Sequence, residues 1–274
     1  MRIMTWNILE GLMSKEGDER NDDSRRRTAA VSLVKELNPD VLVLNEALNC
    51  REHLGHRRDY AAIFGYEHQS SALYDEEWGN AILSRHPIID EFTMLIHPNG
   101  SRQNRGALAV RVESEKETLW VATFHPHPRR RAFKRAGDVD SFLEHLDGPV
   151  VLTGDMNAVS PEDIVDHQAL ISGFERFSPP GEAPRSVGRF LEAGRILFKE
   201  VLPRFGMTDA LPMESRKHTI PTRLISQDLS SAIRIDHLLA NGKIKVKSAR
   251  VVHDARADLA SDHYPIIADI SIIS

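Results

Sequence analysis

The sequence predicts a mixed-sheet α/β sandwich, and three features of its 274 residues support this fold class. Short β-branched and aliphatic runs bounded by turn residues recur along the chain, as expected for many short strands. Segments of helical periodicity alternate with these runs early in the chain. The last three runs follow one another as in a meander, which adds antiparallel strands to the α/β pattern.

The first elements are a strand, a helix and a second strand. Residues 2–9 are expected to form the first strand. Ser24–Leu37 is expected to form a helix, because its apolar side chains share one face and Asn38-Pro39 ends the pattern. Residues 41–44 are continuously apolar, as expected for a strand buried on both faces.

Most of the remaining elements are expected to be strands. One helix is expected between two of them, over residues 129–146. The expected strands are residues 80–83, 91–96, 107–112, 118–124, 150–153, 233–239, 243–252 and 265–270.

We expect a single domain over residues 1–274, with an insertion at about 160–205. That stretch is less regular than its surroundings. It contains a Pro/Gly-rich loop that starts at Ser178. A helical pattern follows, with Phe190 and Leu197 among its apolar positions. We interpret the segment as an addition to the main domain rather than as a second domain.

The composition excludes several classes of protein. Cys50 is the single cysteine, which rules out a disulfide framework within the chain and fits a reducing compartment. No run approaches the roughly 18 apolar residues needed to span a bilayer, and the N-terminal residues lack the apolar core of a signal peptide. The net charge of −5 is unlike that of a duplex-binding domain, although a local basic rim suffices for a nuclease. We therefore expect a cytoplasmic protein.

Short polar segments occur where the predicted strands end. In an open sheet, ligands bind beyond the strand ends, because polar groups converge there without being buried. The residues concerned are Asn7, Glu46, Asp155, Asn157, Asp236, Asp262 and His263.

Two of these residues suit a metal ion. Oxygen ligands without thiolates match a hard cation, and Mg²⁺ takes one or two carboxylates together with phosphate oxygens and water. Glu46 is the natural first ligand, with Asn7 beside it. The sequence therefore predicts a site for Mg²⁺, with Mn²⁺ as the other ion considered.

Other residues of the set suit hydrolysis of a phosphate ester. This reaction needs a base for water, and Asp155 fits that role. Asn157 is expected to donate hydrogen bonds to the phosphoryl oxygens. A histidine held by a carboxylate stabilises developing negative charge, and His263 with Asp236 is the candidate pair.

The set resembles the endonuclease/exonuclease/phosphatase superfamily of metal-dependent hydrolases. This superfamily includes pancreatic-type deoxyribonucleases, exonuclease III-like repair enzymes, bacterial sphingomyelinases, inositol phosphatases and poly(A) deadenylases. Seven segments match in the family's order from near the first residue to near the last. They are Trp6-Asn7-Ile8, Leu44-Asn45-Glu46, residues 79–85, Thr123-Phe124-His125, Gly154-Asp155-Met156-Asn157, residues 234–237 and Ser261-Asp262-His263.

The resemblance implies a four-layer αββα sandwich of two mixed, largely antiparallel sheets flanked by helices, with the site at one edge of both sheets. It implies metal binding for Asn7 and Glu46, and for Asp262 either metal binding or positioning of the terminal histidine. His125 matches the histidine that serves the leaving-group side in the deoxyribonuclease and sphingomyelinase branches. Asp155, Asn157, Asp236 and His263 match the roles given above.

The chain departs from the family's pattern in three places. Asn45 stands where a glutamine is usual, and Leu9 stands where the repair endonucleases carry a polar residue. A Phe-His-Pro-His segment replaces the usual Thr-His-Leu, so that His125 and His127 are both candidates for the histidine that faces the phosphate. These departures argue against an abasic-site endonuclease.

Cationic residues near the set have two interpretations each. Arg105 either contacts a substrate phosphate or forms a surface ion pair. The basic run from Arg129 to Arg135 is either a solvated helix face or part of a rim that binds a polyanion.

On these grounds we expect a Mg²⁺-dependent phosphoesterase that hydrolyses a phosphodiester in nucleic acid or in a nucleotide by Asp-activated attack of water. The alternative is a phosphatase or phosphodiesterase that acts on a lipid or sugar phosphate. A binding module on the same fold is disfavoured, because no expected metal, base or histidine position is lost. The expected partner is the phosphate-ester substrate, nucleic acid included, and no protein partner is evident.

Overall fold

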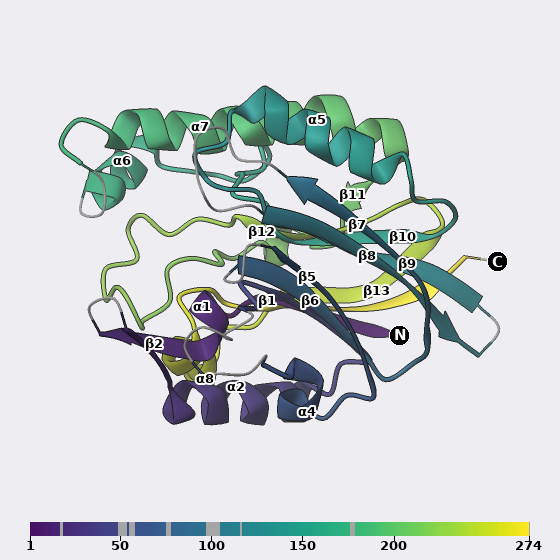
Figure 1. Cartoon of the computed structure of the whole chain (residues 1–274). Helices are drawn as coiled ribbons and strands as arrows, with labels where there is room; N and C mark the ends of the chain where they lie inside the picture. Colours follow the sequence, from purple (N-terminus) through teal and green to yellow (C-terminus); the bar gives the residue numbers. More distant parts are fainter. Residues whose placement is uncertain are drawn as a thin grey trace.

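The computed structural model describes residues 1–16, 19–48, 54, 58–74, 78–96, 105–115, 117–175 and 179–273, and both Cys50 and Ser178 lie outside them. Two six-stranded sheets stack face to face, and helices cover the outer face of each (Figure 1). The predicted four-layer αββα sandwich is confirmed.

The first sheet contains the N-terminal strand and the C-terminal strand side by side. Its pairings are antiparallel except for the central pair of β1 and β4, which is parallel. The strand order is β13 (Ile244–Val251), β14 (Ile266–Ile272), β1 (Arg2–Asn7), β4 (Val41–Asn45), β6 (Trp78–Ser84) and β5 (His68–Tyr74).

The second sheet repeats this plan. Its pairings are antiparallel except for the central pair of β9 and β10, which is parallel. The strand order is β11 (Thr208–Asp209), β12 (Asp236–Ala240), β10 (Val150–Asp155), β9 (Glu117–Phe124), β8 (Arg105–Ser114) and β7 (Ile88–Ile96).

Helices form the two outer layers (Figure 1). The first sheet is covered by α2 (Ser24–Leu37), α4 (Tyr60–Phe64) and α8 (Ala255–Ala260). The second is covered by α5 (Ala132–Leu143) and α7 (Ala183–Ile196), and α7 continues through the turns Leu197–Val201 and Leu202–Phe205. The short elements are α1 (Leu9–Leu12), the hairpin β2 (Met13–Glu16) and β3 (Glu19–Asp22), α6 (His167–Glu175) and a helical turn at Met213–Ser215.

The core explains why the strands are almost continuously apolar. In β8, Leu108 and Val110 belong to the cluster between the two sheets, whereas Ala107 and Ala109 belong to the cluster under α5 and α7. Because successive side chains of a strand point to opposite faces, a strand covered on both faces needs apolar residues at every position.

The two parallel pairs bring four strand ends to one edge of the sandwich. In each pair a helix connects the strands, α2 between β1 and β4 and α5 between β9 and β10. Parallel strands end at the same edge, and the side chain of Asn7 at the end of β1 contacts that of Asp155 at the end of β10. The topology therefore gathers the polar residues that follow these strands.

Several predicted boundaries are wrong, among them the start of the strand expected over 91–96, which begins at Ile88. The first strand ends at Asn7 rather than at residue 9, because Leu9 and Glu10 have positive φ values of 42° and 51° that turn the chain. The strand expected from residue 233 begins at Asp236, since Ile233 forms only an isolated bridge. The helix expected over 129–146 is Ala132–Leu143, because residues 127–130 form a turn.

Several elements have no counterpart in the sequence prediction. The hairpin of β2 and β3, α4 and α8 are too short to show a period. Strand β5 is an edge strand with a polar sequence, so it lacks the apolar run that marks the central strands.

The segment expected to be an insertion, residues 160–205, contains α6 and α7. Ala193, Leu197 and Val201 at its C-terminal end pack into the core that covers the second sheet. The rest of the segment, with α6, lies beside the polar edge of the sandwich and forms its own small cluster with Ile233 and Ile235. That the segment is an insertion stays a prediction. No helix in the described part of the chain is long and apolar enough to cross a membrane.

A buried arginine on α5 fastens the loops that follow β9 and β10. The side chain of Arg135 is fully buried and donates to the carbonyl oxygens of Pro128 and Arg130, each at 3.0 Å, and to that of Asn157. Burial lowers the pKa of this guanidinium to about 10, so it remains charged at neutral pH. The sequence analysis placed Arg135 in a basic run on the surface or at a rim, and its burial corrects that placement.

A second buried arginine does the same in the other half of the sandwich. Arg26 lies on α2 and donates to the carbonyl oxygens of Leu9 and Ala260, each at 2.8 Å, and to that of Ile8 at 3.2 Å. It therefore ties the loop after β1 to the segment that precedes His263. The two guanidinium groups hold four loops at the polar edge.

We expect Arg135→Leu to lower the free energy of unfolding by at least about 3 kcal/mol, because each buried carbonyl left without a donor costs about 1–3 kcal/mol. Urea unfolding followed by circular dichroism measures the change. Arg131→Leu, at an exposed position just before α5, is the matched control and should change stability by less than about 0.5 kcal/mol. Equal stability of the two variants would show that the contacts of Arg135 contribute nothing.

A buried histidine makes the stability depend on pH. Burial and the nearby charge of Arg234 lower the pKa of His237 to about 3. Its Nε2 donates to the carbonyl oxygen of Ala158 at 2.8 Å, whereas its buried Nδ1 has no hydrogen-bond partner among the described residues. Protonation of Nδ1 would thus bury an uncompensated charge.

Lowering the pH from 7 to 5 is therefore expected to reduce the free energy of unfolding, with about 2 kcal/mol coming from His237 alone. The sign follows because the unfolded chain takes up a proton at His237 near pH 6.5, whereas the folded chain does not. Urea titrations at both pH values should give a smaller difference for His237→Gln than for the parent protein. His167→Gln, at an exposed position, is the control. An unchanged difference in His237→Gln would contradict the assignment.

Candidate active site

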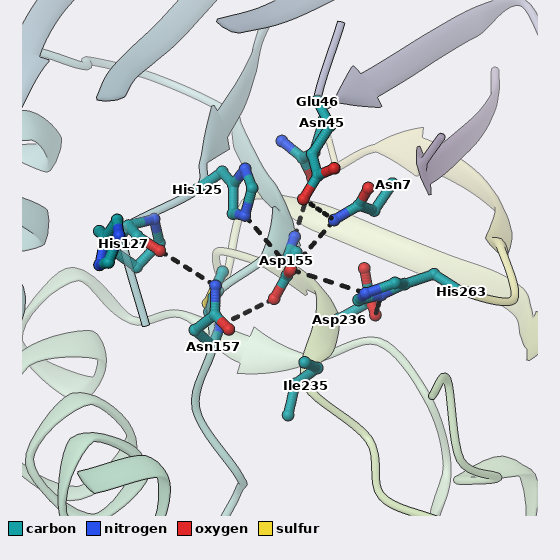
Figure 2. A network of polar contacts seen from close by, with 12 residues as sticks. Asn7, Asn45, Glu46, His125, His127, Asp155, Asn157, Ile235, Asp236 and His263 are labelled. Carbon is teal, nitrogen blue, oxygen red and sulfur yellow. Dashed lines mark hydrogen bonds and ion pairs between the residues drawn. The ribbon is translucent and has the colours of Figure 1, made fainter. Parts of the chain in front are cut away.

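The site lies where four strands end, and each strand contributes one polar residue (Figure 2). Asn7 ends β1 and Asp155 ends β10. Glu46 directly follows β4, and His125 directly follows β9. The structure therefore brings together residues that are up to 148 positions apart in the sequence.

Asp155 is at the centre of the contacts. Its Oδ2 accepts a hydrogen bond from the amide nitrogen of the Asn7 side chain at 3.1 Å and lies 3.3 Å from Nε2 of His125. Its Oδ1 accepts from the backbone N–H of Asn157 at 2.9 Å. The carboxylate is buried, yet both oxygens have partners.

These partners keep Asp155 ionised. Burial by itself raises the pKa of a carboxyl group. The hydrogen bond from His125, the charge of His263 and the backbone amide of Asn157 outweigh that effect and hold the pKa of Asp155 well below its usual value. A buried aspartate that is charged at neutral pH is available to orient water and to accept its proton.

Asn45 fastens Asp155 to both sheets. Its Oδ1 accepts from the backbone N–H of Asp155 at 2.8 Å, and its Nδ2 donates to Asn80 Oδ1 at 2.7 Å and to Thr123 Oγ1 at 2.9 Å. Gly154 must be a glycine at this contact, because its φ is 126° and a Cβ atom would lie 2.7 Å from Asn45 Oδ1. The sequence prediction treated Asn45 as a departure from the family's pattern, and its linking role was missed.

Glu46 and Asn7 could hold a metal ion. Glu46 has a left-handed backbone, with a φ of 57°, which turns its carboxylate toward the cleft. One oxygen accepts from the Asn7 side chain at 3.3 Å and the other accepts from the backbone N–H of Glu10 at 2.9 Å. Asn7 Oδ1 accepts from the backbone N–H of Leu9 at 3.0 Å.

The donor set fits a hard divalent cation. In the described part of the chain, no three His, Cys, Asp or Glu residues lie close enough together to form a protein-only metal cluster. One carboxylate with an amide oxygen leaves most coordination positions to water and phosphate oxygens, which is the arrangement that Mg²⁺ prefers. The residues present therefore fit the ion expected from the sequence.

His263 is held by a carboxylate, as expected. Its Nδ1 donates to Asp236 Oδ2 at 2.7 Å, and its Nε2 lies 3.9 Å from Asp155 Oδ2. Burial opposes protonation, but the negative charges of Asp236, Asp262 and Asp155 raise the pKa of His263 well above its usual value. A protonated His263 thus presents positive charge to the cleft.

Asp262 lies beside this histidine. Its Oδ1 is 4.0 Å from Nε2 of His263 and 3.4 Å from Oγ of Ser261. Glu46 and His263 line the cleft, whereas Asp262 does not. The position of Asp262 beside His263 and outside the cleft lining favours the role of positioning this histidine. Metal binding by Asp262 stays a prediction.

The structure separates the two candidate histidines. His125 is buried against Asp155, whereas His127 is half-buried and accepts a hydrogen bond from the backbone N–H of Arg129 at 3.1 Å. Burial and the charge of Arg105 lower the pKa of His125, so its ring is neutral. His125 rather than His127 therefore contacts the predicted base.

Arg105 reaches the site from the start of β8. One of its NH groups lies 2.8 Å from Nδ1 of His125, and its side chain is buried. The same NH group lies 3.1 Å from Nε2. Because Arg105 only donates and is nearer to Nδ1, whereas Asp155 only accepts and lies beside Nε2, the favoured tautomer has Nδ1 as the acceptor and the proton on Nε2. Arg105 is buried and lines the cleft, so it does not lie on the surface as one of its two interpretations assumed, and its contact with a substrate phosphate stays a prediction.

Asn157 borders the same cleft. Its φ of 49° is left-handed, and its side-chain nitrogen donates to the carbonyl oxygen of Pro126 at 3.0 Å. That bond uses one of its two N–H groups, and the residue lines the cleft beside Asp155. Hydrogen bonding to a phosphoryl oxygen stays a prediction.

A cleft of about 810 Å³ extends from this centre toward α6 and α7. Six of the predicted site residues line one part of it, namely Glu46, Arg105, His125, Asp155, Asn157 and His263. The other part is mainly apolar and is lined by Phe174, Pro179, Phe190, Ile220, Pro221, Ile225, Ile233 and Ile235, together with Arg129 and Arg189. A substrate is thus expected to extend beyond its reacting phosphate.

Comparisons with solved structures show the same fold. A protein of unknown function from Enterococcus faecalis V583 is 18% identical, with a TM-score of 0.68 and full coverage of both chains. An AP endonuclease from Archaeoglobus fulgidus is 16% identical, with a TM-score of 0.66 and coverage of 99% of this chain and 100% of the other. TDP2 from D. rerio, solved with a single strand DNA product, is 15% identical, with a TM-score of 0.62 and coverage of 99% and 98%.

A comparison with curated proteins gives no match. The model of the Endonuclease/Exonuclease/phosphatase family matches residues 4–263, which include every site residue described above. The chain belongs to the endonuclease/exonuclease/phosphatase family.

Proposed function

We propose that the protein is a Mg²⁺-dependent phosphodiesterase in which Asp155 activates the attacking water. The observation that carries this proposal is the buried, ionised carboxylate of Asp155, which lies between the candidate metal ligands and two histidines. Water placed beside this carboxylate would transfer a proton to it while the water oxygen attacks phosphorus and the ester oxygen leaves on the opposite side.

Three neighbours would stabilise the charge that develops on the phosphoryl group. His263 is protonated, His125 carries a proton on Nε2, and Asn157 has a second N–H group. Donors fixed in a buried site act strongly, because they do not need to reorganise during the reaction. A Mg²⁺ or Mn²⁺ ion bound at Glu46 with Asn7 would neutralise charge on the phosphoryl and leaving oxygens.

For the substrate, we propose a phosphodiester of nucleic acid or of a nucleotide. The structural relatives from Archaeoglobus fulgidus and D. rerio, an AP endonuclease and a protein solved with a DNA product, support this class. The second candidate is a lipid phosphate, which the apolar part of the cleft favours. The single cysteine fits the cytoplasmic location expected from the sequence.

Asp155→Asn is expected to reduce the turnover of bis(p-nitrophenyl) phosphate by at least about a hundredfold, because an amide does not accept the proton of water. Glu46→Gln is expected to cause a similar loss that excess Mg²⁺ or Mn²⁺ does not restore. Glu192→Gln, which removes an exposed carboxylate on α7, is the control and should keep full activity. Both site variants should unfold cooperatively in urea. Turnover at the parental rate in folded Asp155→Asn would refute the assignment of the base.

A panel of substrates tests the reaction class. It contains single- and double-stranded DNA, RNA, bis(p-nitrophenyl) phosphate, a phosphomonoester and a sphingolipid, each with Mg²⁺ and with Mn²⁺. We expect cleavage of phosphodiesters and loss of all activity when the ion is chelated. Cleavage of the monoester alone would contradict the phosphodiesterase proposal, and cleavage of the sphingolipid alone would select the second candidate.

A further inference from the structure

Two arginines line the cleft in addition to Arg105. Arg129 follows His127 in the loop after β9, and Arg189 lies on α7. Neither forms an ion pair with a carboxylate in the described part of the chain. Cations of this kind in a cleft are binding groups for an anion, because arginine matches phosphate oxygens in both charge and geometry.

Arg189 is oriented by its own helix. One of its NH groups donates to Oγ of Ser186 at 2.9 Å, and Ser186 also lines the cleft. The Nε atom of Arg189 is buried and has no hydrogen-bond partner among the described residues. By contrast, Arg185 on the same helix is exposed and pairs with Glu182 at 2.9 Å. Arg189 is thus an uncompensated cation on the cleft wall.

Arg129 is the part of the basic run that faces the cleft. Arg130 is bound to Asp138, with one contact of 2.7 Å, and Arg135 is buried against backbone carbonyls. Burial and the charges of Arg105 and Arg129 lower the pKa of His127, which precedes Arg129 in the same loop, to about 4. Arg129 is exposed and lines the cleft, so it is the residue of the basic run to which the rim interpretation can apply.

The cleft that these arginines share with the reacting centre also has an apolar and partly aromatic wall. Phe174 is half-buried and packs edge-on against Phe190, with ring centroids 5.5 Å apart. Ile220 and Ile233 continue the wall. Cationic groups combined with aromatic faces are the usual means of holding single-stranded nucleic acid, in which the bases are exposed. A duplex keeps its bases stacked inside and would present only sugars and phosphates to this wall.

We propose that Arg129 and Arg189 bind a second phosphate of the substrate, next to the phosphate that is cleaved, and that the substrate is a single strand of nucleic acid. The nucleoside between the two phosphates lies against the wall of Phe174 and Phe190. This inference rests on the proposed phosphodiesterase function. An acyl chain would fill the apolar part of the cleft but would leave both guanidinium groups without an anion, and for this reason a lipid is disfavoured.

The test varies the charge of the neighbouring phosphate. Three trinucleotides are compared, one with two ordinary phosphodiesters and two in which the first or the second is an uncharged methylphosphonate. The rate is measured at the bond that remains an ordinary phosphodiester. Wild-type protein is expected to cleave this bond with a kcat/KM about tenfold to a hundredfold lower in at least one neutralised strand than in the doubly charged strand, as expected for one charge-assisted contact. In Arg189→Gln and Arg129→Gln this ratio is expected to fall toward one, whereas Arg185→Gln should retain it.

Binding provides a second measurement that does not depend on turnover. Fluorescence anisotropy with Asp155→Asn protein and labelled trinucleotides should show the same preference for the doubly charged strand. Adding Arg189→Gln to that protein should remove the preference, and adding Arg185→Gln should not. Tighter binding of the doubly charged trinucleotide, together with no hydrolysis of any phosphodiester, would refute the proposed function. The same result would support the second phosphate site.

Two results would overturn the inference. One is a preference for the doubly charged strand that is the same in Arg189→Gln, Arg129→Gln and wild-type protein. The other is hydrolysis of bis(p-nitrophenyl) phosphate or a sphingolipid with no binding of any trinucleotide, which would leave the phosphodiesterase function intact and show that the apolar wall accepts a different group.

Discussion

A buried negative charge at Asp155 is the constraint on which the rest of the site depends. Taking a carboxylate out of water is costly unless hydrogen bonds and opposite charges replace the lost hydration. Here the compensating groups come from both sheets, with Asn7 and Asn45 on one side and His125 and Asn157 on the other. The geometry of the site therefore requires that the two sheets keep their relative position, and the continuous apolar core between them ensures this.

The two sheets share one plan, and this plan brings together the groups that surround the buried charge of Asp155. Each sheet has one parallel pair at its centre, and each pair ends at the edge where the site lies. The helix that connects each pair carries one buried arginine, Arg26 on α2 and Arg135 on α5. These guanidinium groups satisfy the carbonyl oxygens of loops that would otherwise be buried without donors. Strand topology thus sets the place of the site, and the arginines set the conformation of its loops.

The sequence contained the strand-end residues and their order, which sufficed to predict the fold class and to choose Asp155 and His263. It did not reveal what depends on three-dimensional proximity. The contact of Arg105 with His125, and the burial of Arg135 within a basic run, involve residues that local composition marks as exposed. Likewise, the left-handed backbone of Glu46 follows from tertiary packing, because glutamate has no intrinsic preference for that conformation.

The carbonyl contacts of Arg26 and Arg135 also have a consequence for the thermodynamics of ligand binding. Fixing the backbone of a flexible residue costs about 1–2 kcal/mol in conformational entropy. Since the loops that carry the site residues are already fastened to the two helices, that cost is incurred when the chain folds and not when a ligand arrives. Little of the binding free energy is then lost in ordering the site. The affinity depends mainly on how well the ligand matches a preformed surface.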